Sequence, residues 1–222
     1  MELRDAIRTN GTVRRFTTDP VERSTVLSIL DDARFASSGG NRQPWKVAIV
    51  EDRALRRELA VLMQPVWDEY LEPFGADSAP FNAVDWKRPA SITSGKPNEL
   101  LNGIESIPVV LAVAADLRKV ALMDGQLDRP AMTGGGSIYP FCWNLLLSAR
   151  AHGLGGVMTT FLSRVEQVAG PPLGLPAHHA LAATIFLGHP VHQPTKLKRA
   201  AVESFTTIDR FDGSGFGRHD DG

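Results

Sequence analysis

The chain has 222 residues, with 24 lysines and arginines against 25 aspartates and glutamates, so its formal net charge is −1. This balance excludes the broad basic field that nonspecific binding to nucleic acid or anionic membranes requires. No apolar run approaches the roughly 20 residues that span a bilayer. We therefore expect small molecules or a second copy of the chain as partners.

The length favours a single domain, residues 1–222, because no composition shift divides the chain. The only cysteine, Cys142, excludes an intrachain disulfide. Single-cysteine usage is typical of a reducing compartment, and the charged N-terminus does not resemble a signal peptide. The sequence thus predicts a cytoplasmic protein.

Two helices are expected before residue 36. Apolar residues at helical spacing predict the first, which ends near Asn10-Gly11. Asp19-Pro20-Val21-Glu22 predicts the start of the second, with Asp19 as the cap and Pro20 in the first turn. The apolar face of that second helix consists of Val26, Ile29, Leu30 and Ala33.

The stretch 36–50 combines small residues, amide side chains and a strand. Side chains at 37–40 are too small to shield the backbone, so its N–H groups are open to a flat or anionic ligand. Asn41 and Gln43 add donors and acceptors suited to the edge of a heterocycle. After Pro44, Val47–Val50 is expected to be a buried strand. The alternative is an ordinary Gly/Ser loop between helix and strand.

Apolar spacing over Arg53–Leu71 predicts an amphipathic helix. Residues 72–97 contain four prolines together with Phe74, Phe81 and Trp86, which indicates an irregular, aromatic-bearing segment. We expect a lid-like insertion at about 64–100, since long loops in compact domains are often lids. The alternative is a mobile excursion without function.

The second half of the chain alternates strands and helices. The expected elements are a strand at Val109–Ala115, a loop at 116–136, a helix at Ser137–His152, a glycine turn at 153–156, a short helix with Ser163 and Glu166 as its capping box, and a strand at Ala180–Leu187. The helix is apolar nearly all round, so it lies in a core or an interface. Residues 191–222 form a basic, partly apolar arm that could clasp a second subunit.

Several familiar sites are absent from the sequence. There is no phosphate-binding Gly-rich motif and no Gly-x-Ser-x-Gly motif. His178-His179 has no partner at ligand spacing, so no metal site is predicted. Cys142 lies among apolar helix positions and is expected to be a packed thiol rather than a nucleophile.

What remains is a set of cations and glycine segments. Arg14 and Arg199 could pair with a phosphate, and the segments 37–40 and 153–156 could lie against a planar ring. Taken singly, each has a plainer explanation, because most arginines are solvated charges and most glycine pairs end helices.

The order of these motifs is more specific. Thr-Val-Arg-Arg-Phe with Asp-Pro-Val, then Ser-Ser-Gly-Gly-Asn-Arg-Gln-Pro-Trp, Asn-Leu-Leu-Leu-x-Ala-Arg-x-x-Gly-Leu-Gly and Leu-Gly-His-Pro before a basic tail resembles the nitroreductase family of FMN-dependent oxidoreductases. The resemblance spans residues 2–208. It implies an α+β fold with a mostly antiparallel central sheet flanked by helices, and an intertwined homodimer with helix 137–152 at the interface and two FMN molecules.

The resemblance also assigns residues to the cofactor. It implies that Thr12 contacts the FMN phosphate or ribityl chain and that Arg14 lies near N1 and the C2 carbonyl, where a guanidinium stabilises the reduced flavin. It implies that the 36–43 loop crosses the cofactor from the other subunit and that a glycine N–H points at N5. The implied residues of these two sites are Ser37, Ser38, Gly39, Asn41 and Gln43, and then Gly155 and Gly156. Arg199 and Lys196 match the cation on the phosphate.

Two departures from the family pattern concern the cofactor. Asn10-Gly11 stands where the family commonly has one or two basic residues, so phosphate binding would rely more on Arg199. Ser37 replaces a common proline.

The implied function is ping-pong hydride transfer from NADH or NADPH through flavin N5 to a nitroaromatic, quinone or enone. A non-catalytic FMN-sequestering protein is one alternative. A reductive dehalogenase, with Glu69, Tyr70 and Lys87 in the lid, is another.

Overall fold

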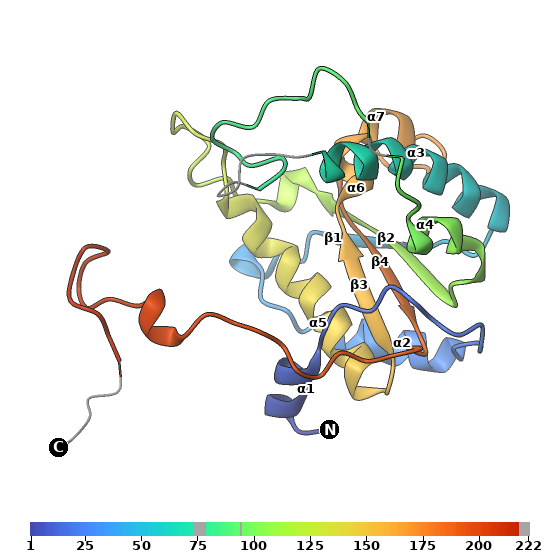
Figure 1. Cartoon of the computed structure of the whole chain (residues 1–222), viewed down its shortest axis with the longest axis horizontal. Helices are drawn as coiled ribbons and strands as arrows, with labels where there is room; N and C mark the ends of the chain where they lie inside the picture. Colours follow the sequence, from blue (N-terminus) through green and yellow to red (C-terminus); the bar gives the residue numbers. More distant parts are fainter. Residues whose placement is uncertain (73–78, 94, 218–222) are drawn as a thin grey trace.

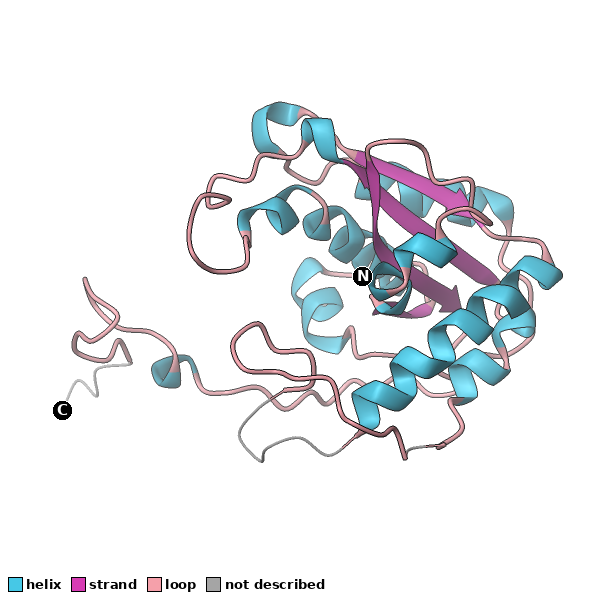
Figure 2. Ribbon diagram, turned by 90° about the horizontal axis from the view of Figure 1, so that it is seen from above, coloured by secondary structure: helices cyan, strands magenta, loops and turns pink. Residues whose placement is uncertain are grey.

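A computed structural model describes residues 1–72, 79–93 and 95–217. It confirms the expected α+β fold, in which helices flank a four-stranded antiparallel sheet of order β1-β2-β4-β3 (Figures 1 and 2). The strands are β1 (Trp45–Ile49), β2 (Val109–Asp116), β3 (Gly155–Thr159) and β4 (His179–Gly188).

The described α-helices are α1 (Leu3–Thr9), α2 (Arg23–Ala33), α3 (Arg53–Leu71), α4 (Glu99–Asn102), α5 (Tyr139–Ala151), α6 (Phe161–Arg164) and α7 (Glu166–Ala169). Short 3-10 turns lie at η1 (Gly39–Asn41), η2 (Ile104–Ser106), η3 (Leu117–Lys119), η4 (Thr133–Ser137) and η5 (Val202–Ser204). The predicted helices at 53–71 and 137–152 are therefore confirmed to within two residues. Of the helices described, none is long and apolar enough to cross a membrane.

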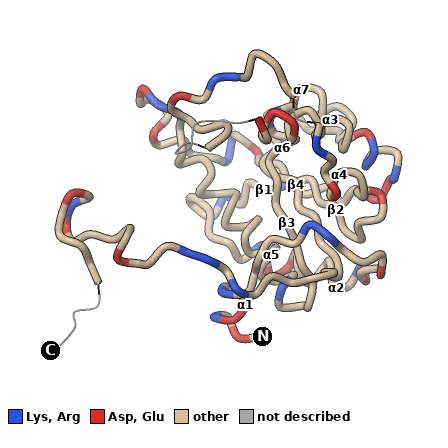
Figure 3. Tube along the Cα trace, viewed as in Figure 1, with Lys and Arg blue, Asp and Glu red and all other residues tan. Residues whose placement is uncertain are grey.

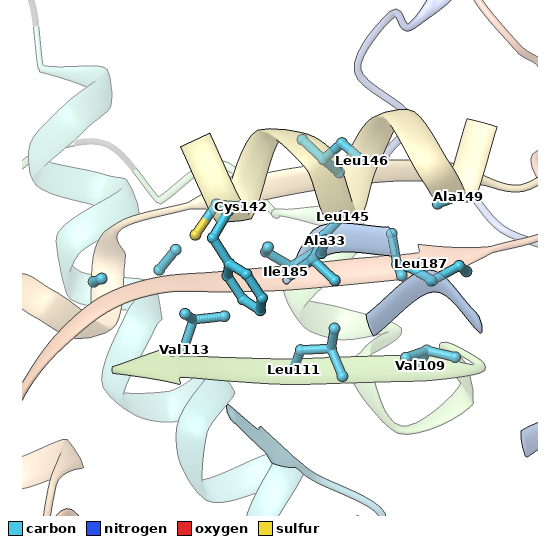
Figure 4. Close-up of a cluster of buried hydrophobic side chains, with 14 of the residues drawn as sticks. Ala33, Val109, Leu111, Val113, Cys142, Leu145, Leu146, Ala149, Ile185 and Leu187 are labelled. Atoms are coloured by element: carbon cyan, nitrogen blue, oxygen red, sulfur yellow. The ribbon is translucent and has the colours of Figure 1, made fainter. Parts of the chain in front are cut away.

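The centre of the sheet is buried on both faces, as the apolar run at 109–115 predicts. Leu111 and Val113 pack with α2 and α5, whereas Val110 and Ala112 face the layer that contains α3, α4 and α6. Figure 4 shows the first of these clusters, with side chains of α5 above those of β2 and β4. Successive side chains of β2 therefore point to opposite faces of the sheet and contribute to a separate hydrophobic core on each face.

The prediction of a buried strand at 47–50 is wrong in its burial. β1 is an edge strand that pairs only with β2, and Ala48 and Ile49 are exposed. Continuous apolar sequence is typical of central strands, but an edge strand beside a helix also buries part of its surface.

Two predicted helix starts are also wrong. Helix α2 begins at Arg23 rather than after Asp19, because the Asp19 carboxylate accepts a hydrogen bond from the Thr17 hydroxyl instead of capping the helix. The capping box at Ser163 and Glu166 does not form. Ser163 lies inside α6, and the Glu166 carboxylate accepts from the backbone N–H of Leu181 on β4. A tertiary hydrogen bond has replaced the local one.

Gly155 and Gly156 do not form the predicted turn. They are the first two residues of β3 and pair with Gly188 and Leu187 of β4. The turn lies just before them, at Gly153, where φ is +79°. Glycine-rich sequence concealed this strand, because glycine is depleted in strands generally.

Helix α3 continues through Pro65 to Leu71, so residues 64–71 of the expected insertion are helical. Within that insertion, residues 73–78 and 94, which include Phe74, lie outside the described residues. At the other end of the chain, the arm after residue 191 runs away from the body and carries η5 (Figures 1 and 2).

Candidate functional site

The first half of the candidate site is formed where residues 12–13 lie beside the start of β3. Thr12 makes a parallel bridge with Gly156, and the N–H of Val13 donates to the Gly156 carbonyl at 2.9 Å. The Val13 side chain is buried, whereas Thr12 and Arg14 on either side are exposed. Three predicted site residues, Thr12, Gly155 and Gly156, therefore meet, with Thr12 and Arg14 on the solvent side of the same segment.

The two glycines allow this close approach. A Cβ on Gly155 would lie 2.6 Å from Val13 Cγ2, and one on Gly156 would lie 2.6 Å from Leu187 Cδ2. Both positions thus need glycine for packing within the chain. Because both glycines are buried, the solvent-facing groups at this junction are the side chains of Thr12 and Arg14.

Arg14 lines a cavity of about 210 Å³. Arg15, next in the chain, lies in the same cavity and pairs with Glu99, with 3.5 Å between Arg15 Nε and Glu99 Oε2. The remaining lining residues are Phe16, Leu100, Gly103, Ser106, Ile107 and Val191. A guanidinium at this exposed edge is available to an electron-rich or anionic group.

The start of the C-terminal arm joins the same region. The N–H of Val191 donates to the Arg15 carbonyl at 3.1 Å, and Phe16 pairs with Pro190 in an isolated bridge. Lys196 and Arg199 follow on the exposed part of the arm. Figure 3 shows basic residues on the stretch of arm nearest the body. Lys196 lies a few residues beyond this junction along the chain, and Arg199 Nη1 donates to the Lys198 carbonyl.

The second half of the candidate site is the 36–43 loop. Its backbone turns sharply, with φ of +60° at Gly40, +52° at Asn41 and +47° at Gln43. The Gln43 N–H donates to Ser38 Oγ at 3.0 Å, and Gln43 Nε2 donates to Asn41 Oδ1 at 3.1 Å. Ser37 is exposed beside them. The loop is therefore shaped by its own polar side chains.

Ser137 attaches this loop to the body of the protein. The N–H of Gly39 donates to Ser137 Oγ at 3.1 Å, across 98 positions of sequence. Because Ser137 precedes α5 and β3 follows α5, the two halves of the site lie toward opposite ends of that helix. A 13-residue helix is about 20 Å long. One chain thus brings Thr12, Gly155 and Gly156 together, but it does not bring the 36–43 loop to them.

Asp124 organises the loop that leads to Ser137. Its carboxylate accepts from Arg129 Nη1 at 2.6 Å, from Thr133 Oγ1 at 2.6 Å and from the N–H of Met132 at 2.8 Å. These donors hold the pKa of Asp124 well below its usual range. No sequence pattern predicts this network, because an aspartate in a polar loop is ordinarily solvated.

A broad apolar cavity of about 980 Å³ lies beside the same loop. Its walls come from η3, η4, the start of α5 and the start of β4. Trp143 and Met132 in these walls are exposed, as is Leu122. Such a surface is typical of a contact with another protein chain or an apolar ligand.

The segment 79–93 is held against α3 and α6 by an arginine that packs against two aromatic rings in contact with each other. The Arg164 guanidinium lies 4.7 Å from the ring centroid of Phe81 and 4.8 Å from that of Trp86. Arg164 Nη2 also donates at 3.1 Å to the buried carboxylate of Glu69, and Tyr70 packs against Phe81. Glu69 and Tyr70 therefore hold this segment, while Lys87 is exposed.

Cys142 is fully buried, and burial raises the pKa of its thiol to about 12. The prediction of a packed thiol is confirmed. Among residues 1–72, 79–93 and 95–217, no group of three or more His, Cys, Asp or Glu residues is arranged to hold a metal ion.

Comparison with known proteins adds to this geometry. The model of the nitroreductase family matches residues 7–189. An NADH dehydrogenase of Thermus thermophilus is 29% identical over 205 residues, which cover 91% of this chain and 94% of that protein. A 5,6-dimethylbenzimidazole synthase of Rhodospirillum rubrum is 29% identical over 195 residues, covering 86% of this chain and 84% of that protein.

Solved structures share the fold. The NADPH:FMN oxidoreductase from Vibrio harveyi complexed with NAD+ has a TM-score of 0.68 at 20% identity, covering 94% of this chain and 77% of that one. An iodotyrosine deiodinase bound to FMN and 3-iodo-L-tyrosine has a TM-score of 0.65 at 22% identity, covering 90% and 96%.

Proposed function

This chain belongs to the nitroreductase family of oxidoreductases, and on that premise we propose that it binds FMN and transfers hydride from NADH or NADPH to a small acceptor such as a nitroaromatic, quinone or enone. Bound FMN supplies a centre at N5 that accepts and then donates hydride, so donor and acceptor react in turn. The carrying observation is the junction of Thr12 with Gly156, because it places the exposed side chains of Thr12 and Arg14 beside two glycines that have no side chain.

In this proposal the first half of the site binds the length of the cofactor. The exposed guanidinium of Arg14 stabilises negative charge that develops at N1 and the C2 carbonyl. The hydroxyl of Thr12 hydrogen-bonds the ribityl chain or phosphate, and the backbone at Gly155 and Gly156 approaches the ring. Lys196 and Arg199 neutralise the phosphate.

The second half comes from another copy of the chain. Because the 36–43 loop and Thr12 lie toward opposite ends of α5, one FMN needs Thr12 from one chain and Ser38, Gly39, Asn41 and Gln43 from the other. The apolar surface around Trp143 and Met132 would be covered in such a homodimer. A twofold axis then gives two equal sites.

The visible spectrum tests this function. Protein purified under native conditions should show flavin absorbance or take up added FMN, and anaerobic NADH or NADPH should bleach it rapidly. Absence of both flavin binding and NAD(P)H oxidation would contradict the proposal. Flavin that binds but is not bleached would instead favour the alternative, an FMN-sequestering protein.

Reductive dehalogenation is a second candidate on the same scaffold, since a similar solved structure is an iodotyrosine deiodinase. The segment with Glu69, Tyr70 and Lys87 would then cover the halogenated ring. Halide release from a halophenol with NAD(P)H as reductant would support it, and nitroaromatic or quinone turnover without halide release would exclude it. The single, buried cysteine agrees with a cytoplasmic setting for either reaction.

A further inference from the structure

Gln193 joins the C-terminal arm to the N-terminal segment. Its Nε2 donates to the carbonyl of Thr9 at 3.1 Å and to the carbonyl of Gly11 at 3.2 Å. These carbonyls belong to the residues just before Thr12. One side chain of the arm therefore fixes where the arm crosses the strand-like segment that leads into the site.

Gly11 allows the arm to cross in contact with that segment. A Cβ at Gly11 would lie 2.6 Å from the Pro194 carbonyl oxygen and 3.0 Å from Leu197 Cδ2. Any side chain there would displace the arm. Lys196, the first cation of the arm, precedes Leu197 in the chain, and Thr12 follows Gly11. Lys196 and Thr12 are therefore each one residue away from the contact between Gly11 and Leu197.

The segment beneath the arm supplies little positive charge of its own. Residues 9–13 contain no lysine or arginine. Arg14 and Arg15, which follow, line the cavity that also contains Glu99, and Arg15 pairs with that carboxylate. An anionic group bound near Thr12 can therefore draw on Lys196 and Arg199 of the exposed arm in addition to Arg14.

The crossing also contains two buried amide atoms that do not contribute to its stability. Gln193 Oε1 and Asn10 Nδ2 are both buried and lack a hydrogen-bond partner in the part of the chain that the structure describes. Unpaired buried amide groups oppose folding. An apolar side chain at position 193 would remove the unpaired Oε1, but it would also remove the hydrogen bonds to the carbonyls of Thr9 and Gly11.

We propose that Gln193, together with Gly11, is a positioning residue that fixes the arm so that Lys196 and Arg199 bind the phosphate of the flavin cofactor. This inference rests on the proposed function. Asn10-Gly11 carries no positive charge for the phosphate. In this account, phosphate affinity depends on where the arm is placed as well as on the charge of the arm.

The test compares FMN with riboflavin, which lacks the phosphate. Quenching of flavin fluorescence gives both dissociation constants for the full-length apoprotein, for Gln193→Leu and for Lys196→Ala. Gln193→Leu keeps the approximate size but removes the donor. Gln167→Leu, an exposed glutamine on α7, is the matched control.

We expect Gln193→Leu and Lys196→Ala each to weaken FMN binding about tenfold and to leave riboflavin binding unchanged. The double variant should be little worse than either single one, because both act through the same phosphate contact. Raising the salt concentration should reduce the preference of the wild-type protein for FMN over riboflavin.

Equal weakening of FMN and riboflavin by Gln193→Leu, or no weakening of either, would overturn the inference and leave the proposed function intact. Failure of the wild-type protein to bind either flavin would overturn the proposed function itself. If Gln193→Leu unfolds at assay temperature, Gln193→Asn, which keeps the donor on a shorter side chain, replaces it in the same comparison.

Discussion

The two halves of the candidate site are built in different ways. Thr12, Gly155 and Gly156 meet through backbone pairing at the edge of the sheet, and glycines make the contact tight. The 36–43 loop is held by side chains instead, through Ser38, Ser137 and, further back, Asp124. The first half is therefore rigid, whereas the second depends on a few polar contacts and, in the proposed homodimer, on a neighbouring chain.

The largest effect should come from breaking the rigid half. Gly156→Ala places a Cβ 2.6 Å from Leu187 Cδ2 and 2.7 Å from Leu146 Cδ2, so we expect the free energy of unfolding to fall by about 2 kcal/mol. Gly136→Ala is the control, since no atom lies within 4 Å of the added Cβ. Urea unfolding should separate the two variants, and equal midpoints would show that the junction is not tightly packed.

A smaller effect is expected when the loop is detached. Ser137→Ala removes the acceptor for the Gly39 N–H and should cost about 1 kcal/mol of loop stability. Hydrogen exchange at residues 36–43 should speed up, while exchange in β3 stays as slow as in the wild type. Ser28→Ala, which removes an exposed hydroxyl from α2, is the matched control. Faster exchange across the whole sheet would contradict the local role of Ser137.

The segment 79–93 offers a third comparison. Arg164→Met removes both ring contacts and the hydrogen bond to Glu69. We expect the free energy that holds the segment against α3 and α6 to fall by about 1 kcal/mol. Trp86 should become more hydrated, so that tryptophan emission shifts to the red. Arg34→Met removes an exposed guanidinium 4.6 Å from Phe35 and should leave the emission unchanged. An unshifted spectrum for Arg164→Met would show that the segment is held elsewhere.

The smallest effect concerns pH. The folded pKa of Asp124 lies below the unfolded value of about 3.9, so its stabilising contribution is fully present above that value and is lost as pH falls toward the folded pKa. Below about pH 4, unfolding of the wild type takes up as much as about one proton more than unfolding of Asp124→Asn, because Asp124 is then protonated only in the unfolded chain. The stability of the wild type should therefore fall more steeply with acid than that of the variant. Thermal unfolding from pH 5 to pH 2.5 measures the two slopes, and equal slopes would contradict the network.

Periodicity predicted the regular core accurately. The helix at 53–71 and the strands at 109–115 and 180–187 were visible because their apolar residues repeat at the spacing of the element. β3 was missed because its first two residues are glycines. The start of α2 and the helix at Ser163 were misplaced because Asp19 and Glu166 bond to groups other than the local helix.

The site was only partly predictable. Motif order predicted Thr12, Gly155 and Gly156 as candidate site residues, and the structure brings these three together. Ser137, Asp124 and Gln193 were missed, because each acts through a contact whose partner is distant in sequence or is a backbone group. A single serine, aspartate or glutamine that acts in this way forms no recognisable sequence motif.

The central claim is that one cofactor site takes its two halves from two chains. It is tested with Arg14→Glu, which changes the first half, and Gly39→Phe, whose Cβ would have only Ser137 Oγ within 4 Å, at 3.5 Å. Differently tagged variants are co-expressed, and the heterodimer is purified through both tags.

Each variant alone should bind no FMN, whereas the heterodimer should bind about one FMN per dimer, since one of its two sites combines unaltered halves. Flavin absorbance of the purified heterodimer gives this ratio directly. No flavin in a stable heterodimer would contradict a site shared between two chains.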